Sequence, residues 1–356
     1  MVKPQWIGAA LLLVAIAATG TNERWLIRHT KSLEEGLRRV VVLPEPVSTA
    51  QNDGKLVLIS GRITTDPSVM DSEATATRTP YVLDPVFGIA ARGIRLYRTV
   101  EMLQWVETAH TSVTSSPGGV EDDRDGGVDE HREKTYIYDL RWRAERVDSL
   151  NFHDLSYQNP SDDAWIFKSK VVDAEAVVVG DFKLSHELID QIQRKDGVAL
   201  DTESLKTMRI VLQQRIGKDW EKSSALKDVT VEDKYFYLLR DGAGRPSLGD
   251  LRVSFSVNPP YPVTISGKQE MQHILPFRTS VGEDILLLED GTLSAAELFK
   301  SKISIRYKHN RFYRLFTVVL GFIGFLVLHP VLRQRFGPIF SAPQKHLLSL
   351  LLSHLV

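Results

Sequence analysis

The sequence contains no cysteine in 356 residues. That absence excludes disulfide bonds and metal sites built on thiolates, and it leaves the cellular compartment open. A chain of this length buries enough apolar surface to fold without such links. The sequence also has no large excess of positive or negative charge, because 44 basic and 45 acidic residues leave a formal net charge of −1. With no field to attract nucleic acid, we predict no nucleic-acid partner.

Catalytic and ligand-binding motifs are scarce as well. The sequence holds no phosphate-binding glycine loop, no GxSxG nucleophile elbow and no HExxH or other zinc-binding spacing. His186-Glu187 lacks a second histidine four residues later, so a polar helix face explains it better than a metal site. His153, Asp154 and Ser156 could be a fragment of a catalytic triad, but a polar turn explains their proximity as well. We assign no catalytic, cofactor-binding or metal-binding residue and predict that the chain is not an enzyme.

The segment 108–134 has almost no apolar side chains, which predicts a mobile, solvated loop. Part of it matches positions 1, 3, 5, 6 and 9 of a calcium-binding loop, with Glu121, Asp123, Asp125, Gly126 and Asp129. Position 12 is Arg132, where calcium binding requires a bidentate glutamate. We therefore interpret the segment as a solvated loop without calcium.

Two long apolar runs dominate what is present. The first, Trp6 to Gly20, contains fifteen residues without a charge. Lys3, the apolar run and the small residues Ala15 and Ala17 fit a cleaved signal peptide. With its polar neighbours included, the same run approaches the roughly 20 residues that a membrane-spanning helix needs. This end of the chain alone leaves both interpretations open.

The second run, Leu315 to Leu332, has eighteen residues without a fixed charge. Arginines bracket it closely at positions 311, 314, 333 and 335, which favours a membrane span over a buried core helix. Gly321 and Gly324 present a small-residue surface where another helix can approach. His329 lies near the end of the run beside Pro330, and we assign it to hydrogen bonding at the membrane interface.

Between the two runs, strand and helix patterns alternate. Strands are predicted at Val40–Leu43, Leu56–Ser60, Ile94–Val106, Tyr136–Ala144, Leu251–Val257 and Ile285–Leu288. Helices are predicted over 21–39, after a cap at Ser185, over 205–216, and after a capping box formed by Ser294 and Glu297. Two of the strands, Ile94–Val106 and Tyr136–Ala144, look like the arms of an antiparallel hairpin.

These patterns predict a membrane protein with an α+β, β-rich and largely antiparallel extramembrane domain between two transmembrane helices. We divide the chain into an N-terminal anchor (1–22), the domain (23–313), a C-terminal transmembrane helix (314–333) and a tail (334–356). The tail includes His346–Val356, which is too short to cross a membrane but could begin a further span.

Several strings, taken in order, resemble the Transmembrane protein 43 family, also called LUMA. The opening of that family is similar to Thr21–Glu23 and Ser32–Leu37 here. Its most distinctive string resembles VEMLQWVET, Val100–Thr108, and GDLRVSFS, Gly249–Ser256, follows in the same order. The run from Leu275 to Phe299 completes the resemblance, which extends over essentially the whole chain up to Leu332.

The resemblance implies an uncleaved first span, a large lumenal domain of the endoplasmic reticulum and a C-terminal membrane region. It also implies residence in the inner nuclear membrane, partners such as lamins and emerin, and a role in organising the nuclear envelope rather than catalysis. In a bacterium the equivalent location would be the cell membrane. The family ends with several spans, whereas this chain shows one clear span and a stub from Leu347.

The basic flanks of the two runs disagree with a lumenal domain. On the domain side lie Arg24, Arg28, Lys31, Lys302, Arg306, Lys308, Arg311 and Arg314. The positive-inside rule associates such residues with the cytoplasm. A domain of this length translocates largely regardless of flanking charge, so we follow the family and predict a lumenal domain.

We predict a membrane-tethered scaffold of the endoplasmic reticulum and inner nuclear membrane that organises envelope protein complexes, with homo-oligomerisation left open. The alternative is an accessory subunit of a membrane channel or signalling receptor complex, for which Gly321 and Gly324 would supply the helix contact. A third hypothesis, a membrane-anchored hydrolase, requires His153, Asp154 and Ser156 to converge in one pocket.

Overall fold

The computed structural model describes residues 4–65, 81–115, 130–216, 226, 228–241 and 244–336. The chain forms two compact units, and the predicted domain 23–313 contributes to both. Unit 1 comprises Met1–Ile63, Val178–Ile192 and Tyr261–Val356, and unit 2 comprises Thr64–Val177 and Gln193–Pro260. Two long apolar helices flank a β-rich, largely antiparallel middle region, which confirms the predicted fold class.

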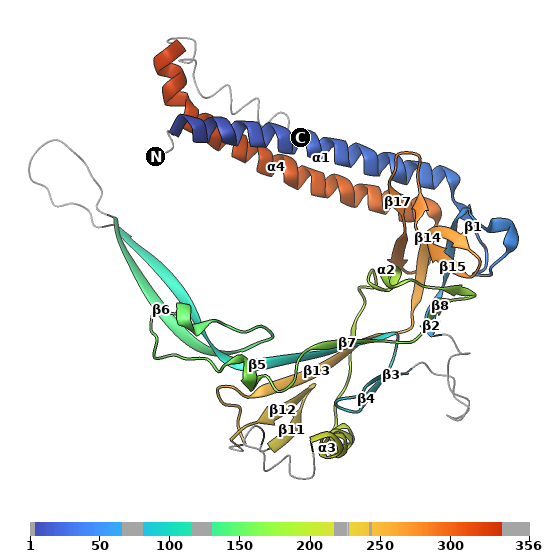
Figure 1. The fold of residues 1–356 in the computed structure, drawn as a ribbon, viewed down its shortest axis with the longest axis vertical. Coiled ribbons are helices and arrows are strands. Elements are labelled where there is room, and N and C mark those ends of the chain that lie inside the picture. The colour runs from blue at the N-terminus through green and yellow to red at the C-terminus, as the bar shows by residue number, and fades with distance from the viewer. Residues whose placement is uncertain are drawn as a thin grey trace, which may run out of the picture. The chain divides into compact units, whose positions relative to one another are not determined.

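Two helices dominate unit 1, α1 (Pro4–Arg39) and α4 (Ala295–Phe336). They run side by side over most of their length (Figure 1). Both are long and apolar enough to cross a membrane. The chain is accordingly a membrane protein with two candidate transmembrane helices.

Both helices continue well beyond their apolar runs. In α1 the helix predicted over 21–39 is confirmed, and it follows the apolar run without a break, burying Leu26 and Leu33. The capping box at the start of α4 is also confirmed. Ser294 N donates to Glu297 Oε2 at 2.8 Å, and Glu297 N donates to Ser294 Oγ at 3.3 Å. Each helix therefore has an apolar half and an amphipathic half, and the amphipathic half packs on the strands of unit 1.

The sheet of unit 1 has the strand order β1-β2-β8-β9-β15-β14-β18, and β2 also pairs with β14. The strands are β1 (Val41–Val42), β2 (Leu56–Thr65), β8 (Val177–Val179), β9 (Phe182–Lys183), β14 (Pro262–Glu270), β15 (His273–Leu275) and β18 (Leu287–Asp290). A small hairpin, β16 (Phe277–Arg278) and β17 (Asp284–Ile285), and the short helix α2 (His186–Ile189) complete it.

One hydrophobic cluster joins both helices of unit 1 to its strands. Leu33 of α1, Leu58 of β2, Ile285 of β17 and Phe299 of α4 are buried together in it. Gly36 of α1 is needed at this contact, because an added Cβ would lie 2.5 Å from Ile285 Cδ1 and 2.6 Å from Phe299 Cε1. The helix pair is thus part of the core of unit 1.

The main sheet of unit 2 has the order β11-β12-β13-β5-β6, with β10 on β13 and β7 on β5. Its strands are β5 (Arg95–Ser115), β6 (Glu130–Arg143), β7 (Lys170–Asp173), β10 (Asp196–Gly197), β11 (Asp228–Glu232), β12 (Tyr235–Leu239) and β13 (Leu251–Asn258). The hairpin β3 (Tyr81–Asp84) and β4 (Ile89–Arg92) and the helix α3 (Thr202–Ile216) pack with it. Short 3-10 turns lie at Ala50–Asn52 in unit 1 and at Ser149–Asn151 and Asp162–Ala164 in unit 2.

The predicted antiparallel hairpin is confirmed as β5 and β6, and it is longer than expected. Its register runs from Met102 opposite Arg143 to Ser115 opposite Glu130. Residues 108–115 and 130–134, predicted as part of the loop, are paired strand. The β-branched residues Thr108, Thr111, Val113 and Thr114 favour a strand in the first arm, and the second arm pairs with it. The remaining part of that loop, including the calcium-like spacing at 121–129, lies outside the described residues.

A buried ion pair links β3 to β5 inside unit 2. Arg98 Nη1 donates to Asp84 Oδ1 and Oδ2 at 2.9 and 2.8 Å, and the Asp84 residue is 0% exposed. Asp84 also accepts the backbone N–H groups of Val86 and Phe87, each at 2.9 Å. Arg98 Nε donates to the Lys168 carbonyl at 3.0 Å. Several hydrogen bonds thus compensate both members of the pair, as a buried charge requires.

Candidate functional site

Glycines bring α1 and α4 into close contact within their apolar halves. A Cβ added at Gly8 would lie 2.9 Å from the Gly324 carbonyl oxygen, and one added at Gly324 would lie 3.0 Å from the Gly8 carbonyl oxygen. Further along, a Cβ added at Gly321 would lie 3.5 Å from Ala15 Cβ. Small residues permit this close packing, as in other membrane helix pairs. The small-residue surface predicted at Gly321 and Gly324 thus contacts the chain's own first helix.

A polar cluster closes the helix pair at the domain-side end of the apolar runs. Asn22 Nδ2 donates to Oδ1 of Asn310, a residue that is only 1% exposed. Asn310 Nδ2 donates to Glu23 Oε1 at 3.5 Å. Arg314 donates to both Glu23 oxygens, from Nε at 2.6 Å and from Nη2 at 2.8 Å. Directional bonds of this kind fix the register of two helices more sharply than apolar contacts do.

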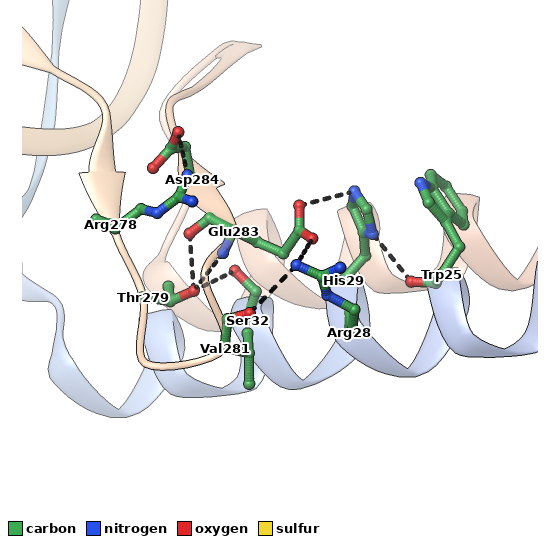
Figure 2. Close-up of polar contacts among 9 residues, drawn as sticks. All are labelled: Trp25, Arg28, His29, Ser32, Arg278, Thr279, Val281, Glu283 and Asp284. Atoms are coloured by element: carbon green, nitrogen blue, oxygen red, sulfur yellow. Dashed lines mark hydrogen bonds and ion pairs between the residues drawn. The ribbon is translucent and has the colours of Figure 1, made fainter.

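Beyond this cluster, α1 is tied to the loop of the β16–β17 hairpin (Figure 2). Glu283 Oε1 forms an ion pair with Arg28 Nη2 at 3.0 Å, and Glu283 Oε2 lies 3.3 Å from His29 Nε2. Arg28 also donates to the Val281 carbonyl at 3.5 Å. The other ring nitrogen of His29, Nδ1, is 2.9 Å from the Trp25 carbonyl oxygen. One carboxylate in the hairpin loop thus contacts two consecutive side chains of α1.

A second set of contacts lies one to two turns further along α1. Glu35 accepts the Ser280 backbone N–H at 3.0 Å and also the Ser280 hydroxyl, and Arg39 donates to it at 2.7 Å. The Thr279 hydroxyl donates to the Glu283 carbonyl at 2.7 Å and accepts from the buried Ser32 hydroxyl, whose oxygen lies 3.3 Å away. We call this region, from Arg28 to Arg39 of α1 and Thr279 to Glu283 of the hairpin, the junction. It attaches the end of a candidate transmembrane helix directly to the folded unit.

The junction was not predicted from the sequence. In the sequence Arg28 is one of several basic flanking residues, and Glu35 and Glu283 belong to no catalytic or ligand-binding motif. Charged side chains on a helix or in a loop usually point to solvent, so their residue type carries no signal. Glu35 and Ser280 are 245 residues apart in sequence, and only the fold brings them together.

Comparison with known proteins shows to which family this chain belongs. The model of the Transmembrane protein 43 family matches residues 102–351. This chain belongs to the Transmembrane protein 43 family. It is 29% identical to human Transmembrane protein 43 over 312 residues, which cover 84% of this chain and 66% of the human protein. It is 24% identical to the Transmembrane protein 43 homolog of Drosophila melanogaster, covering 94% of this chain and 80% of that protein.

The chain therefore spans about two thirds, 66%, of the length of the mammalian relatives that it matches. No solved structure matches it. The structure shows where the strings that resemble the Transmembrane protein 43 family lie. Val100–Thr108 belongs to β5 and Gly249–Ser256 leads into β13, and these strands pair, with Met102 opposite Leu251. The run from Leu275 to Phe299 contains the β16–β17 hairpin and therefore one side of the junction.

The hydrolase hypothesis fails on geometry, because His153, Asp154 and Ser156 share one turn but form no relay. The Ser156 backbone N–H donates to Asp154 Oδ1 at 2.9 Å, and this bond holds the pKa of Asp154 below its ordinary value. The His153 ring stacks on Tyr136 with the centroids 4.2 Å apart. A triad needs the carboxylate on the imidazole and the imidazole on the hydroxyl. The polar-turn interpretation explains these contacts.

A hydrogen-bonded group beside this turn holds it on the β5–β6 hairpin. Glu107 Oε2 accepts both the Tyr138 hydroxyl and the His153 backbone N–H, each at 2.6 Å. The Tyr138 oxygen in turn accepts the Asp154 N–H at 2.8 Å. Burial, together with the bond to Glu107, raises the pKa of the Tyr138 hydroxyl. These groups stabilise the turn, and the Transmembrane protein 43 family is not known as an enzyme.

The remaining candidates from the sequence do not form sites among the described residues. His186 and Glu187 lie in the short helix α2. Among all the described residues, no group of three or more histidine or acidic side chains could hold a metal ion. His329 lies in α4, where its ring packs against Phe325 at 5.8 Å between centroids. The tail 337–356 lies outside the described residues.

Proposed function

We propose that this protein is a membrane-tethered structural scaffold of the endoplasmic reticulum and inner nuclear membrane. In this role it organises envelope protein complexes, with lamins and emerin-like envelope proteins as partners. The observation that supports the proposal is the junction. Because α1 passes from its apolar half into the core of unit 1 without a linker, a folded unit is held directly at the membrane surface. Such an attachment suits a protein that positions partners rather than one that turns over a substrate.

The alternative, an accessory subunit of a channel or receptor complex, relied on Gly321 and Gly324. Gly324 already packs against Gly8, Leu11 and Leu12 of α1, and Gly321 lies opposite Ala15, so this surface serves packing within the chain. The scaffold is therefore the better supported function.

Crosslinking in intact nuclear-envelope membranes tests the scaffold. We expect full-length chain to be recovered linked to lamins and to emerin, identified by mass spectrometry of the linked peptides. An unrelated two-span protein of the endoplasmic reticulum, expressed at the same level, is the control and should not yield these links. Recovery of monomer alone, with no envelope protein attached, would falsify the scaffold proposal.

The same proposal places unit 1 on the lumenal side, and one substitution tests this. None of the six asparagines begins an Asn-X-Ser/Thr acceptor, since Asn159 is followed by proline. Asp290→Asn creates an Asn-Gly-Thr acceptor at the exposed end of β18. Asparagine keeps an oxygen for the Tyr261 hydroxyl, which donates to Asp290 at 2.7 Å. We expect the variant to acquire a glycan in microsomes, detected as an endoglycosidase-sensitive mass increase.

Val47→Asn, with Ser48 and Thr49 following, supplies an independent acceptor in unit 1. Thr292→Ala, added to Asp290→Asn, removes the first acceptor and should abolish its glycan. If both acceptors stay unmodified in correctly inserted protein, the domain faces the cytosol and the lumenal assignment is wrong.

A further inference from the structure

The apolar half of the helix pair contains an open groove of about 430 Å³. Its lining includes Leu12 and Phe325, together with the facing small residues Ala15 and Gly321. At the domain-side end the Thr19 hydroxyl donates to the Ala15 carbonyl at 2.8 Å, and the Thr317 hydroxyl donates to the Arg314 carbonyl at 3.0 Å. Because both hydroxyl protons are already donated within their own helices, the groove has no free hydroxyl donor, and its other lining side chains are apolar.

Exposed cations continue the same face of α4 beyond the end of the groove. Residues seven positions apart lie on nearly the same face of a helix, because two turns contain about seven residues. Arg311 therefore shares a face with Val318, which lines the groove. Lys308 shares a face with Leu315 and with Phe322, which also lines the groove. Arg311 precedes Thr317 by six residues, about 9 Å along the axis.

These two cations are available to an anion. Both side chains belong to exposed residues, and within the described part of the chain no acidic side chain lies within ion-pair distance of either. The nearby carboxylate of Glu23 is engaged by Arg314. Tyr313, 61% exposed, lies beside these cations in sequence and adds an amphipathic ring of the kind that is enriched at membrane–water interfaces.

We propose that the groove and the two cations together form a binding site for an anionic phospholipid. An acyl chain occupies the groove along Ala15 and Gly321, and the phosphate lies at Lys308 and Arg311. Charge complementarity and the alignment of the two parts on one helix face carry this proposal. It depends on the helix pair lying in a membrane and not on the scaffold function.

A second copy of the chain fits the same surface less well. Copies in one membrane share their orientation, so a symmetric contact through the groove would bring Lys308 and Arg311 close to their own equivalents. Like charges that face each other in this way are destabilising. A phospholipid brings an apolar chain and a negative headgroup in the required order.

The test uses the full chain purified from vesicles of phosphatidylcholine and phosphatidylglycerol, with retained lipid counted by native mass spectrometry. We expect the wild type to retain phosphatidylglycerol in preference to phosphatidylcholine. Lys308→Gln with Arg311→Gln should lower that preference by roughly 5- to 30-fold, since each cation contributes to attraction of anionic lipid. Arg333→Gln, an exposed charge at the other end of α4, is the matched control and should leave it unchanged.

A second variant tests the groove separately. The space above Gly321 accepts a Cβ at 3.5 Å from Ala15, so the remaining atoms of Gly321→Leu would fill the groove. This variant should lose retained phosphatidylglycerol although both cations remain, with its helix content checked by circular dichroism. Equal retention of the two lipids by the wild type would overturn the proposal. So would unchanged retention in Gly321→Leu, an equal loss in Arg333→Gln, or a lipid-free dimer as the main species.

Discussion

Replacing Arg98 by methionine should destabilise unit 2 by about 3–5 kcal/mol, the usual cost of removing one partner from a buried ion pair. Asp84 would remain as a buried carboxylate, and its partners among the described residues would be the N–H groups of Val86 and Phe87. The Lys168 carbonyl would lose the Arg98 donor as well. The measurement is urea unfolding of the purified protein, with hydrogen exchange of peptides from β3 and β5 to show that the loss lies in unit 2.

An exposed ion pair provides the control for this variant. Arg146 and Asp162 are 3.4 Å apart, but their side chains are 44% and 74% exposed. Arg146→Met should therefore cost no more than about 1 kcal/mol. Replacing Asp84 by leucine in the Arg98→Met background should recover part of the loss, because the orphaned charge is then gone. If the Arg98 and Arg146 variants lose equal stability, the buried pair does not have the role described.

Introducing a leucine at position 324 should separate the two membrane helices. The added Cβ would lie 3.0 Å from the Gly8 carbonyl oxygen, Leu11 Cβ and Leu12 N, so the backbones have to move apart. Overpacking of this kind costs about 1–3 kcal/mol, which corresponds to a factor of roughly 5 to 150 in an equilibrium between close and separated helices.

The absence of cysteine makes this separation measurable. A Cβ at position 321 would lie 3.5 Å from Ala15 Cβ, a separation that suits a disulfide, so Ala15→Cys with Gly321→Cys should oxidise readily within one chain. Adding Gly324→Leu should slow that oxidation by roughly the factor of 5 to 150 given above. Gly20→Leu is the matched control, because nothing lies within 4 Å of a Cβ added there. Rapid oxidation that persists in the Gly324→Leu variant would contradict the observed packing of α1 on α4.

Local pattern was sufficient to predict the elements whose signal is periodic. The apolar runs, the β5–β6 hairpin, the strand from Leu251 and the capping box at Ser294 were all predicted and are present. Residues 108–115 were not predicted as strand, because threonine and serine are typical of both loops and exposed strands. Pairing with β6 decides between the two, and that information lies outside the segment.

The site was less predictable than the fold. Asn22 pairs with Asn310, and Glu35 with Ser280, although each lies in a separate part of the sequence. Neither residue type signals a partner, and their roles follow from the antiparallel packing of α1 and α4 and from the position of the β16–β17 hairpin. The predicted surface at Gly321 and Gly324 was correctly located, while the helix that covers it was identified only by the structure.

The length of β5 has a consequence for the distance over which unit 2 can act. β13 accompanies β5 only as far as Met102, and the stretch from Leu103 to Ser115 continues with β6 as its strand partner. At about 3.3 Å per residue this two-stranded extension reaches roughly 40 Å past the end of β13, further than the roughly 30 Å thickness of a bilayer's hydrocarbon layer. A molecule held by the far end of the extension therefore stands well clear of the sheet from which it projects.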